Sequence, residues 1–249
     1  MHRKRFGDAS SMSKRVVLIY NMGHSGGRWL QDVFNRHPDV QLWQEANHYL
    51  KVDHLDSDSQ LDSVYEFFRS QLSLCNKRVI GLIKSFDDRS IKLCEEYGGS
   101  IFQMYSHPVN VLDAKDGKKI KECVTAGLLK LPANEEDTFR AHAMFYASIY
   151  KTYIDRSYKW PIIKLEDLNE SIKSDFQYFI KISKIFFDIE WNNKSLVDIR
   201  SMYNVNGNLS RAYSEHTPSC NIFNRWPEWK KSIFTTTFSN VLIRSGYRI

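Results

Sequence analysis

The residues with the clearest chemical potential lie in a glycine-rich turn, NMGHSGGR at residues 21–28. This turn follows a short apolar, β-branched run at residues 15–20 and precedes apolar residues at helical spacing, so we expect a strand, a turn and a helix. The start of a helix offers backbone N–H groups and the positive end of the helix dipole, and both attract anions. Because Arg28 adds a cation and Ser25 a small hydroxyl, the sequence favours phosphate binding over a turn that only begins a helix.

The turn departs from two common nucleotide-binding patterns. It is not G-x-x-x-x-G-K-[ST], because no Lys-Ser or Lys-Thr pair follows, and it is not G-x-G-x-x-G. Neither a standard nucleotide triphosphatase nor a Rossmann dinucleotide site is supported. An ATP-dependent kinase stays as a less favoured alternative, since the sequence has no evident magnesium-binding pair, and no metal site is expected.

Four side chains are candidates for catalysis. Glu45 follows an apolar run at residues 40–44, and His48, three residues on, has a pKa suited to proton transfer near neutral pH. Lys84 ends another apolar run, and His24 lies in the turn itself. Each has a structural alternative. Glu45 could be a surface carboxylate, His24 and His48 could be ordinary loop histidines, and Lys84 could be a strand-end lysine that reaches toward solvent.

Two further pairs of residues have a structural explanation as well as a chemical one. Glu166 and Asp167 resemble an acid–base pair when taken alone. The family resemblance described below implies instead that their carboxylates cap the following helix. Trp226 and Trp229, close to Arg225, are either a base-stacking patch or part of an aromatic core.

Strands and helices alternate along the chain. We expect strands at residues 15–20, 40–44, 78–84, 100–106 and 160–165, and helices at residues 26–37, 58–72, 87–97, 137–156, 171–186 and 228–245. Residues 187–226 are expected to be irregular, with a flexible loop at residues 204–210. This alternation predicts an α/β fold with a mainly parallel central sheet flanked by helices, and ligands in such folds bind beyond the carboxyl ends of the strands.

Composition limits the class of protein. The 249-residue chain has 42% hydrophobic and 26% charged residues, which suits a folded domain and excludes a disordered or fibrous protein. We expect residues 1–14 to be a flexible basic tail and residues 15–249 to form a single domain. The net charge of +6 favours an anionic partner, but it is spread along the chain without a recognisable module, so nucleic acid is not expected.

Cysteine usage and hydropathy indicate the compartment. The four cysteines form no C-x-x-C pair, which argues against a zinc site or a disulfide framework: they are Cys75, Cys94, Cys123 and Cys220. No apolar run reaches a membrane-spanning length. We therefore expect a cytoplasmic protein that does not bind a membrane.

Five segments, in order, resemble the PAPS-dependent sulfotransferases, where PAPS is 3′-phosphoadenosine 5′-phosphosulfate. GHSGGRWLQDVFNRHPDV is similar to the family's 5′-phosphosulfate-binding loop, and LWQEANHYL to a later segment with an acidic residue, matched by Glu45. SIFQMYSHPVNVLDA resembles the 3′-phosphate strand and loop, and WPIIKLEDL resembles V-x-R-Y-E-D-L. RWPEWKKSI and LIRSGY are similar to the C-terminal W-K segment and the terminal L-G-Y.

This resemblance implies a P-loop-like sulfotransferase fold and the transfer of a sulfuryl group from PAPS to a hydroxyl or amine of a small-molecule or saccharide acceptor. It implies Glu45 or His48 as the general base, with His24 and Lys84 close to the transferred group. The cofactor-binding residues would be Gly23, His24, Ser25, Gly26, Gly27, Arg28, Trp29, Ser106, Arg225 and Lys230.

The chain also departs from the family pattern at the 3′-phosphate segment. Ser106 stands where the family has arginine, Asn110 where it has aspartate, and Ala114 where it has serine. Arg225, Lys230 and Lys231 are the candidates to replace the missing phosphate ligands. The alternative is a catalytically degenerate relative that binds a nucleotide or polyanion without turnover.

Overall fold

The structure, a computed structural model, describes seven stretches of the chain: residues 14–21, 26–44, 58–84, 88–113, 134–156, 159–205 and 219–248. The predicted tail, apart from Lys14, and the greater part of the predicted loop at residues 204–210 lie outside these residues. Cys123 also lies outside them, and the other three cysteines are free thiols.

A parallel sheet forms the centre of the described protein. Its strands are β1 Arg15–Asn21, β2 Val40–Gln44, β3 Val79–Lys84, β4 Ser100–Tyr105 and β5 Ile162–Lys164. They lie in the order β2-β3-β1-β4-β5, and every neighbouring pair is parallel. The expectation of an α/β fold with a mainly parallel sheet is confirmed.

Helices connect the strands and complete the chain. They are α1 Gly27–Phe34, α3 Asp58–Leu74, α4 Asp88–Glu96, α5 Pro108–Asp113, α7 Glu135–Asp155, α8 Leu165–Lys173, α9 Gln177–Ile182, the π-helix η1 Ser183–Phe187, α10 Asn193–Val205, α12 Ser219–Arg225 and α13 Glu228–Ser245. None of the described helices has the combination of length and apolar character that crossing a membrane requires.

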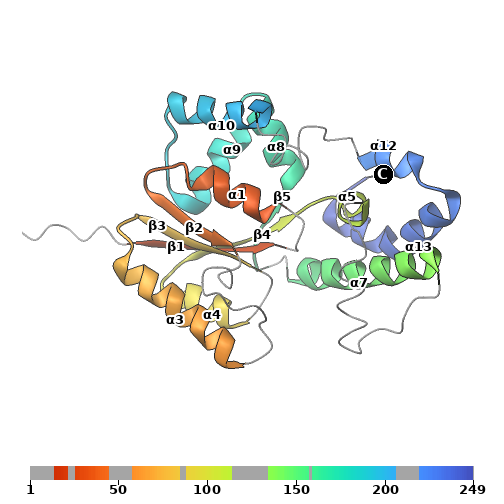
Figure 1. The fold of residues 1–249 in the computed structure, drawn as a ribbon, viewed down its shortest axis with the longest axis horizontal. Helices are drawn as coiled ribbons and strands as arrows, with labels where there is room; N and C mark the ends of the chain where they lie inside the picture. Colours follow the sequence, from red (N-terminus) through yellow and green to blue (C-terminus); the bar gives the residue numbers. More distant parts are fainter. Residues whose placement is uncertain are drawn as a thin grey trace, which may run out of the picture.

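The two faces of the sheet are covered by different helices. Alternate residues of β1 point to opposite faces, so Val16 and Leu18 join one core cluster while Val17 and Ile19 join another. The first cluster includes side chains of α3, α4, α7 and α13, and the second includes side chains of α1, α8, α9, η1 and α10. Figure 1 shows these two layers on either side of the strands, with α7 and α13 side by side.

The predicted strand at residues 160–165 and the helix after it were wrong in their bounds. Only Ile162–Lys164 forms the strand, and α8 already begins at Leu165. Leu165, Leu168 and Ile172 are all buried at helical spacing, so the apolar run that indicated a longer strand is shared between two elements. The chain then breaks at Phe176, whose positive φ of 63° ends one helical path before α9 begins.

The expectation of irregular structure at residues 187–226 was also wrong for two parts of that range. Residues 193–205 form α10 and residues 219–225 form α12. The side chain of Asn192 accepts a hydrogen bond from the Ser195 N–H at 2.8 Å, as an N-terminal cap does, and Ile199 is fully buried. A polar composition concealed this helix, because only one side of it faces the core.

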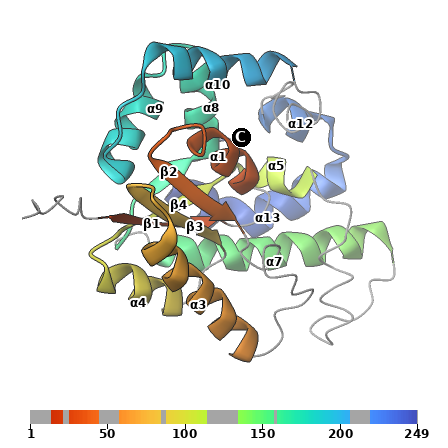
Figure 2. The same cartoon turned by 60° about the vertical axis from the view of Figure 1, so that its left-hand side comes forward.

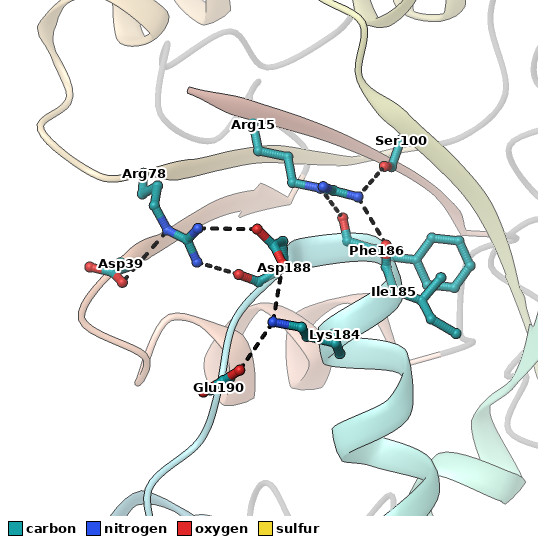
Figure 3. A network of polar contacts seen from close by, with 9 residues as sticks. All are labelled: Arg15, Asp39, Arg78, Ser100, Lys184, Ile185, Phe186, Asp188 and Glu190. Atoms are coloured by element: carbon teal, nitrogen blue, oxygen red, sulfur yellow. Dashed lines mark hydrogen bonds and ion pairs between the residues drawn. The ribbon is translucent and has the colours of Figure 1, made fainter. Parts of the chain in front are cut away.

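An arginine network joins the amino ends of the strands to the π-helix (Figure 3). Arg15 donates from Nε to the Phe186 carbonyl at 2.8 Å and from Nη2 to the Ile185 carbonyl at 2.9 Å. Arg78 pairs with the Asp188 carboxylate at 3.3 Å. These contacts satisfy carbonyl groups at the end of a helix and hold the amino-terminal edge of the sheet, opposite the edge where a ligand is expected.

Candidate functional site

The helix that follows β1 begins in a conformation suited to an anion. Gly26 has φ 77° and ψ 22°, a left-handed conformation that glycine adopts without strain, and it immediately precedes α1. The first intrahelical bond runs from the Leu30 N–H to the Gly26 carbonyl at 2.9 Å. Within the described residues no side chain caps this end, and its first turn holds no acidic residue. The N-terminus of α1 therefore offers backbone N–H groups and the positive end of the helix dipole, both of which suit an anionic ligand.

Gly27 packs closely against the side chains that end two strands of the sheet, β1 and β2. A Cβ atom at Gly27 would lie 2.1 Å from Nδ2 of Asn21 and 3.1 Å from Nε2 of Gln44. Asn21, the last residue of β1, is buried, and the backbone N–H of Gln44 donates to Oε1 of Gln31 in α1 at 3.0 Å. A side chain at position 27 would thus have to displace the amide groups of Asn21 and Gln44 at the ends of β1 and β2.

Arg28 and Trp29, both predicted to bind the cofactor, point in different directions. Arg28 is exposed in the first turn of α1, whereas Trp29 is only 5% exposed and belongs to the core cluster beneath that helix. Burial raises the pKa of Asp32, one turn further on, and the positive charges of Arg28 and Arg36 oppose that rise. Arg28 is therefore the described side chain that adds positive charge at this end of α1.

The strand order reverses beside this helix, at the kind of position where open α/β sheets bind their ligands. The connection after β1 leads through α1 to β2 on one side of the sheet, and the chain after β4 leads to β5 on the other side. Such a reversal opens a crevice beyond the carboxyl ends of the two neighbouring strands. Asn21 at the end of β1 lies level with Met104, one residue before the end of β4. The start of α1 follows β1, and the loop that leads into α5 follows β4, so both lie at the carboxyl ends of neighbouring strands, the ends that the arrowheads mark in Figure 2.

The loop after β4 is organised around one carboxylate. Oε1 of Glu166 accepts hydrogen bonds from Ser106 Oγ at 2.9 Å, from the His107 N–H at 2.6 Å and from Asn110 Nδ2 at 3.2 Å. Glu166 lies inside the first turn of α8, and no side chain of the described residues caps that helix, so the expectation that Glu166 caps it is wrong. Ser106, predicted to bind the cofactor, is 4% exposed and its hydroxyl already donates to this carboxylate.

The predicted basic ligands lie away from Ser106. Lys230 pairs with Glu135 at 3.6 Å and sits 5.1 Å from the centre of the Phe139 ring on α7. Tyr150, which donates its hydroxyl to the Ser106 carbonyl, is about 16 Å further along the same helix. The structure therefore does not bring Lys230 to the loop after β4.

Arg225 lies closer to that loop, at the end of α12. Ser219 at the start of this helix donates to Oδ1 of Asn110 at 3.1 Å, and Arg225 lies about 9 Å along the helix from Ser219. Arg225 is exposed, and its Nε donates to the Asn221 carbonyl at 3.2 Å. Lys231, the third basic candidate, pairs with Glu228 at 2.8 Å.

The tryptophans of the late segment belong to an aromatic cluster. Trp226 is buried, with Phe139 and Phe234 in edge-on contact at ring-centre distances of 5.4 and 5.6 Å. Its indole N–H donates to Asp113 at 3.0 Å, which fixes α12 against the end of α5. Of the two interpretations of these tryptophans, the aromatic core is the one that this packing favours for Trp226.

The other predicted site residues are placed only in part. Gly23, His24, Ser25, Glu45 and His48 lie outside the described residues. Lys84 ends β3 and lies level with Tyr20 of β1, so its backbone is at the same edge of the sheet as the crevice. Within the described stretches, no cluster of three histidine, cysteine or acidic side chains is arranged to hold a metal ion.

Sequence reasoning missed three residues that shape this edge. Asn21 was assigned to the glycine-rich turn and Gln44 to the end of a strand, although polar residues that end buried strands at the carboxyl edge are a usable signal. Tyr247, whose hydroxyl donates to Oε2 of Glu166 at 3.1 Å, was seen only as part of a terminal motif. Nothing in its sequence position indicates that it returns to the loop after β4.

Comparisons with known proteins agree with this architecture. No protein-family model and no curated protein matches the sequence. The sulfotransferase domain from the curacin biosynthetic pathway matches over 95% of this chain and 99% of its own, with 10% identity and a TM-score of 0.51. Mouse sulfotransferase SULT7A1, solved in complex with PAP, matches over 94% of this chain and 85% of its own, with 14% identity and a TM-score of 0.53.

Sequence identities of 10% and 14% show a shared fold and not a shared reaction. The match extends over nearly the whole chain, including the parallel sheet and the helices on both of its faces. The five ordered motifs predicted the same architecture from the sequence. The chain therefore has the P-loop-like α/β fold of the sulfotransferases.

Proposed function

We propose that the protein is a sulfotransferase that uses PAPS and transfers its sulfuryl group to a hydroxyl or amine of a small-molecule or saccharide acceptor. The observation that carries the proposal is the left-handed Gly26 directly before α1, whose start no side chain of the described residues caps, at the reversal point of a sheet with the sulfotransferase fold. A phosphosulfate is an anion of the kind that this end of a helix binds.

The described residues support a cradle for such a cofactor. Gly27 lets the backbone of α1 approach Asn21 and Gln44, and Arg28 extends from the same turn into solvent. PAPS, when bound, supplies the sulfuryl group. We assign to Gly26, Gly27 and Arg28 the binding of its 5′-phosphosulfate, together with the neighbouring Gly23, His24 and Ser25 of the motif. Trp29, whose side chain lies in the core, would contribute its backbone N–H.

Sulfuryl transfer asks the protein to align donor and acceptor and to neutralise charge on the bridging oxygen, by analogy with phosphoryl transfer. We propose Glu45 or His48 as the base that takes the acceptor's proton, with His24 and Lys84 close to the transferred group. Lys84 ends β3, which pairs with β1, and Glu45 follows β2, which pairs with β3, so the two positions lie at the carboxyl ends of strands on the same side of β1 and support this assignment.

The direct experiment is to incubate the protein with labelled PAPS and a broad panel of hydroxyl and amine acceptors. We expect label on at least one acceptor, and Arg28→Ala to lower the affinity for PAPS at least about tenfold, as expected for loss of a charge-assisted hydrogen bond. Arg36→Ala is the matched control, because Arg36 is an exposed arginine just beyond the far end of α1 that also acts on Asp32. Equal losses in the two variants would remove Arg28 from the site.

A second candidate is a binding protein that has kept the fold and lost turnover. The observation in its favour is that Ser106 and Asn110 both donate to Glu166, so neither offers those hydrogen atoms to a 3′-phosphate. Nucleotide binding without label transfer to any acceptor would favour this alternative.

A further inference from the structure

One carboxylate links three distant parts of the chain at the carboxyl edge of the sheet. Glu166 of α8 accepts four hydrogen bonds, which come from Ser106 Oγ, the His107 N–H, Asn110 Nδ2 and Tyr247 OH. Three of these donors converge on Oε1 at 2.6–3.2 Å, and the tyrosine donates to Oε2 at 3.1 Å. The loop after β4 and the C-terminal segment are thus held by a single side chain.

The C-terminal segment is fixed at several points around Glu166. The Tyr247 ring meets the His107 ring edge-on at 4.8 Å, and Lys164 Nζ donates to the Gly246 carbonyl at 2.9 Å. His107 accepts the Val109 N–H at Nδ1, so its Nε2 carries the proton and donates to the Arg248 carbonyl at 3.0 Å. Burial raises the pKa of Tyr247 well above its ordinary value, which keeps its hydroxyl protonated as a donor.

This cluster lies at the carboxyl end of β4, beside the reversal point of the sheet. The loop begins where β4 ends, β4 pairs with β1, and β1 leads to the start of α1. The buried hydroxyl of Tyr150 also donates to the Ser106 carbonyl, so the loop is held from α7 as well as from α8. Glu166 and Tyr150 together therefore hold the loop at the carboxyl end of β4 in place.

We infer that Glu166 is a positioning residue for the nucleotide crevice, which fixes the loop after β4 and the C-terminal segment before a ligand arrives. It acts by accepting hydrogen bonds and does not touch the ligand. A glutamine can replace it, because its amide oxygen accepts the three converging donors and its NH₂ donates to the Tyr247 oxygen. An alanine leaves all four donors without this acceptor.

The test compares Glu166→Gln, Glu166→Ala and Leu72→Ala in two measurements. Leu72 is buried on α3, and its carbonyl accepts from Lys14 just before β1, so Leu72→Ala lowers stability at the amino-terminal edge of the sheet, opposite the crevice. The first measurement is the affinity for adenosine 3′,5′-bisphosphate and adenosine 5′-monophosphate, a choice of probes that rests on the proposed function. The second is the amide exchange rate of His107, which needs no ligand.

We expect Glu166→Ala to weaken binding of both nucleotides at least about tenfold and to accelerate His107 exchange, while Glu166→Gln stays within about threefold of the native protein in both. Leu72→Ala is expected to lower Tm without changing affinity. The inference would be overturned if Glu166→Ala bound the nucleotides with native affinity. It would also be overturned if the glutamine and alanine variants lost affinity and accelerated His107 exchange to the same extent. If the native protein binds neither nucleotide, the proposed function fails, and unchanged His107 exchange in Glu166→Ala would then separately overturn the role of Glu166.

Discussion

Adjacent glycines at the start of α1 meet two different physical demands. Gly26 adopts a positive φ of 77°. Gly27 has no Cβ, which would otherwise crowd the side chains of Asn21 and Gln44. The glycine turn itself is visible in the sequence, because strand, glycines and helix follow one another. The crowding at Gly27 is not visible, because it depends on where the ends of β1 and β2 meet the helix.

Gly27→Ala is expected to destabilise the protein by roughly 1–3 kcal/mol, as overpacking does, and also to weaken nucleotide binding. The matched control is Gly81→Ala in β3, where a Cβ would lie 2.4 Å from Leu42 Cδ2 and 2.9 Å from the Val17 carbonyl, within the sheet. Urea denaturation should show comparable losses of stability in the two variants. Only Gly27→Ala should lose affinity in calorimetry, and an equal loss in Gly81→Ala would contradict a local role for Gly27.

Arg225→Ala is expected to weaken binding of adenosine 3′,5′-bisphosphate by ~1.5–3 kcal/mol, the range for a hydrogen bond to a charged group. Adenosine 5′-monophosphate, which lacks the 3′-phosphate, should lose much less. Lys231→Ala is the control, because Lys231 pairs with Glu228. If both nucleotides lose the same affinity, or neither does, Arg225 is not a ligand of the 3′-phosphate.

Among the helices and strands, hydrophobic periodicity predicted an element correctly where its buried residues recur at regular spacing. The runs at residues 15–20 and 40–44 became β1 and β2, and the final helix was placed at residues 228–245 as observed. The pattern failed at residues 165–173, where buried Leu165 and Leu168 serve a helix directly after a three-residue strand. A switch of period inside one apolar run cannot be located without knowing which neighbours cover it.

The π-helix is expected to contribute a pH-dependent share of stability through Asp188. The hydrogen bond from Lys184, aided by Arg78, lowers the pKa of Asp188 below its ordinary 3.8. When the pKa of a carboxyl group is lower in the folded state than in the unfolded state, the charged group stabilises the folded protein at any pH above the unfolded-state pKa. That stabilisation is lost as the pH falls through the folded-state pKa. The advantage of the native protein over Asp188→Asn should thus be constant above about pH 5 and shrink progressively below about pH 4.

Urea denaturation across that pH range measures this difference. Asparagine suits the left-handed backbone at position 188, where φ is 52°, so the substitution tests the charge rather than the conformation. Asp198→Asn on the exposed side of α10 is the control, since its carboxylate makes no ion pair within the described stretches. A stability difference for Asp188→Asn that does not change with pH would contradict the ion-pair explanation shown in Figure 3.

In the molecule as a whole, the amino-terminal and carboxyl-terminal edges of the sheet have different roles. The amino-terminal edge is closed by Arg15 and Arg78, which bind carbonyl and carboxylate groups of the π-helix segment. The carboxyl-terminal edge brings together the start of α1, the loop after β4 and the C-terminal segment. The sequence predicted the fold and the position of this second edge. It did not predict Glu166 as the residue that joins its parts, because that contact spans about 60 residues in one direction and about 80 in the other.

The proposed function requires this edge of the sheet to bind the nucleotide of a sulfuryl donor. Calorimetric titration with adenosine 3′,5′-bisphosphate and, separately, with ATP and Mg²⁺ measures this binding. We expect a dissociation constant on the order of micromolar for adenosine 3′,5′-bisphosphate, about −8 kcal/mol of binding free energy, and much weaker binding of ATP with Mg²⁺. Preferential binding of ATP with Mg²⁺, or no binding of either nucleotide, would contradict it.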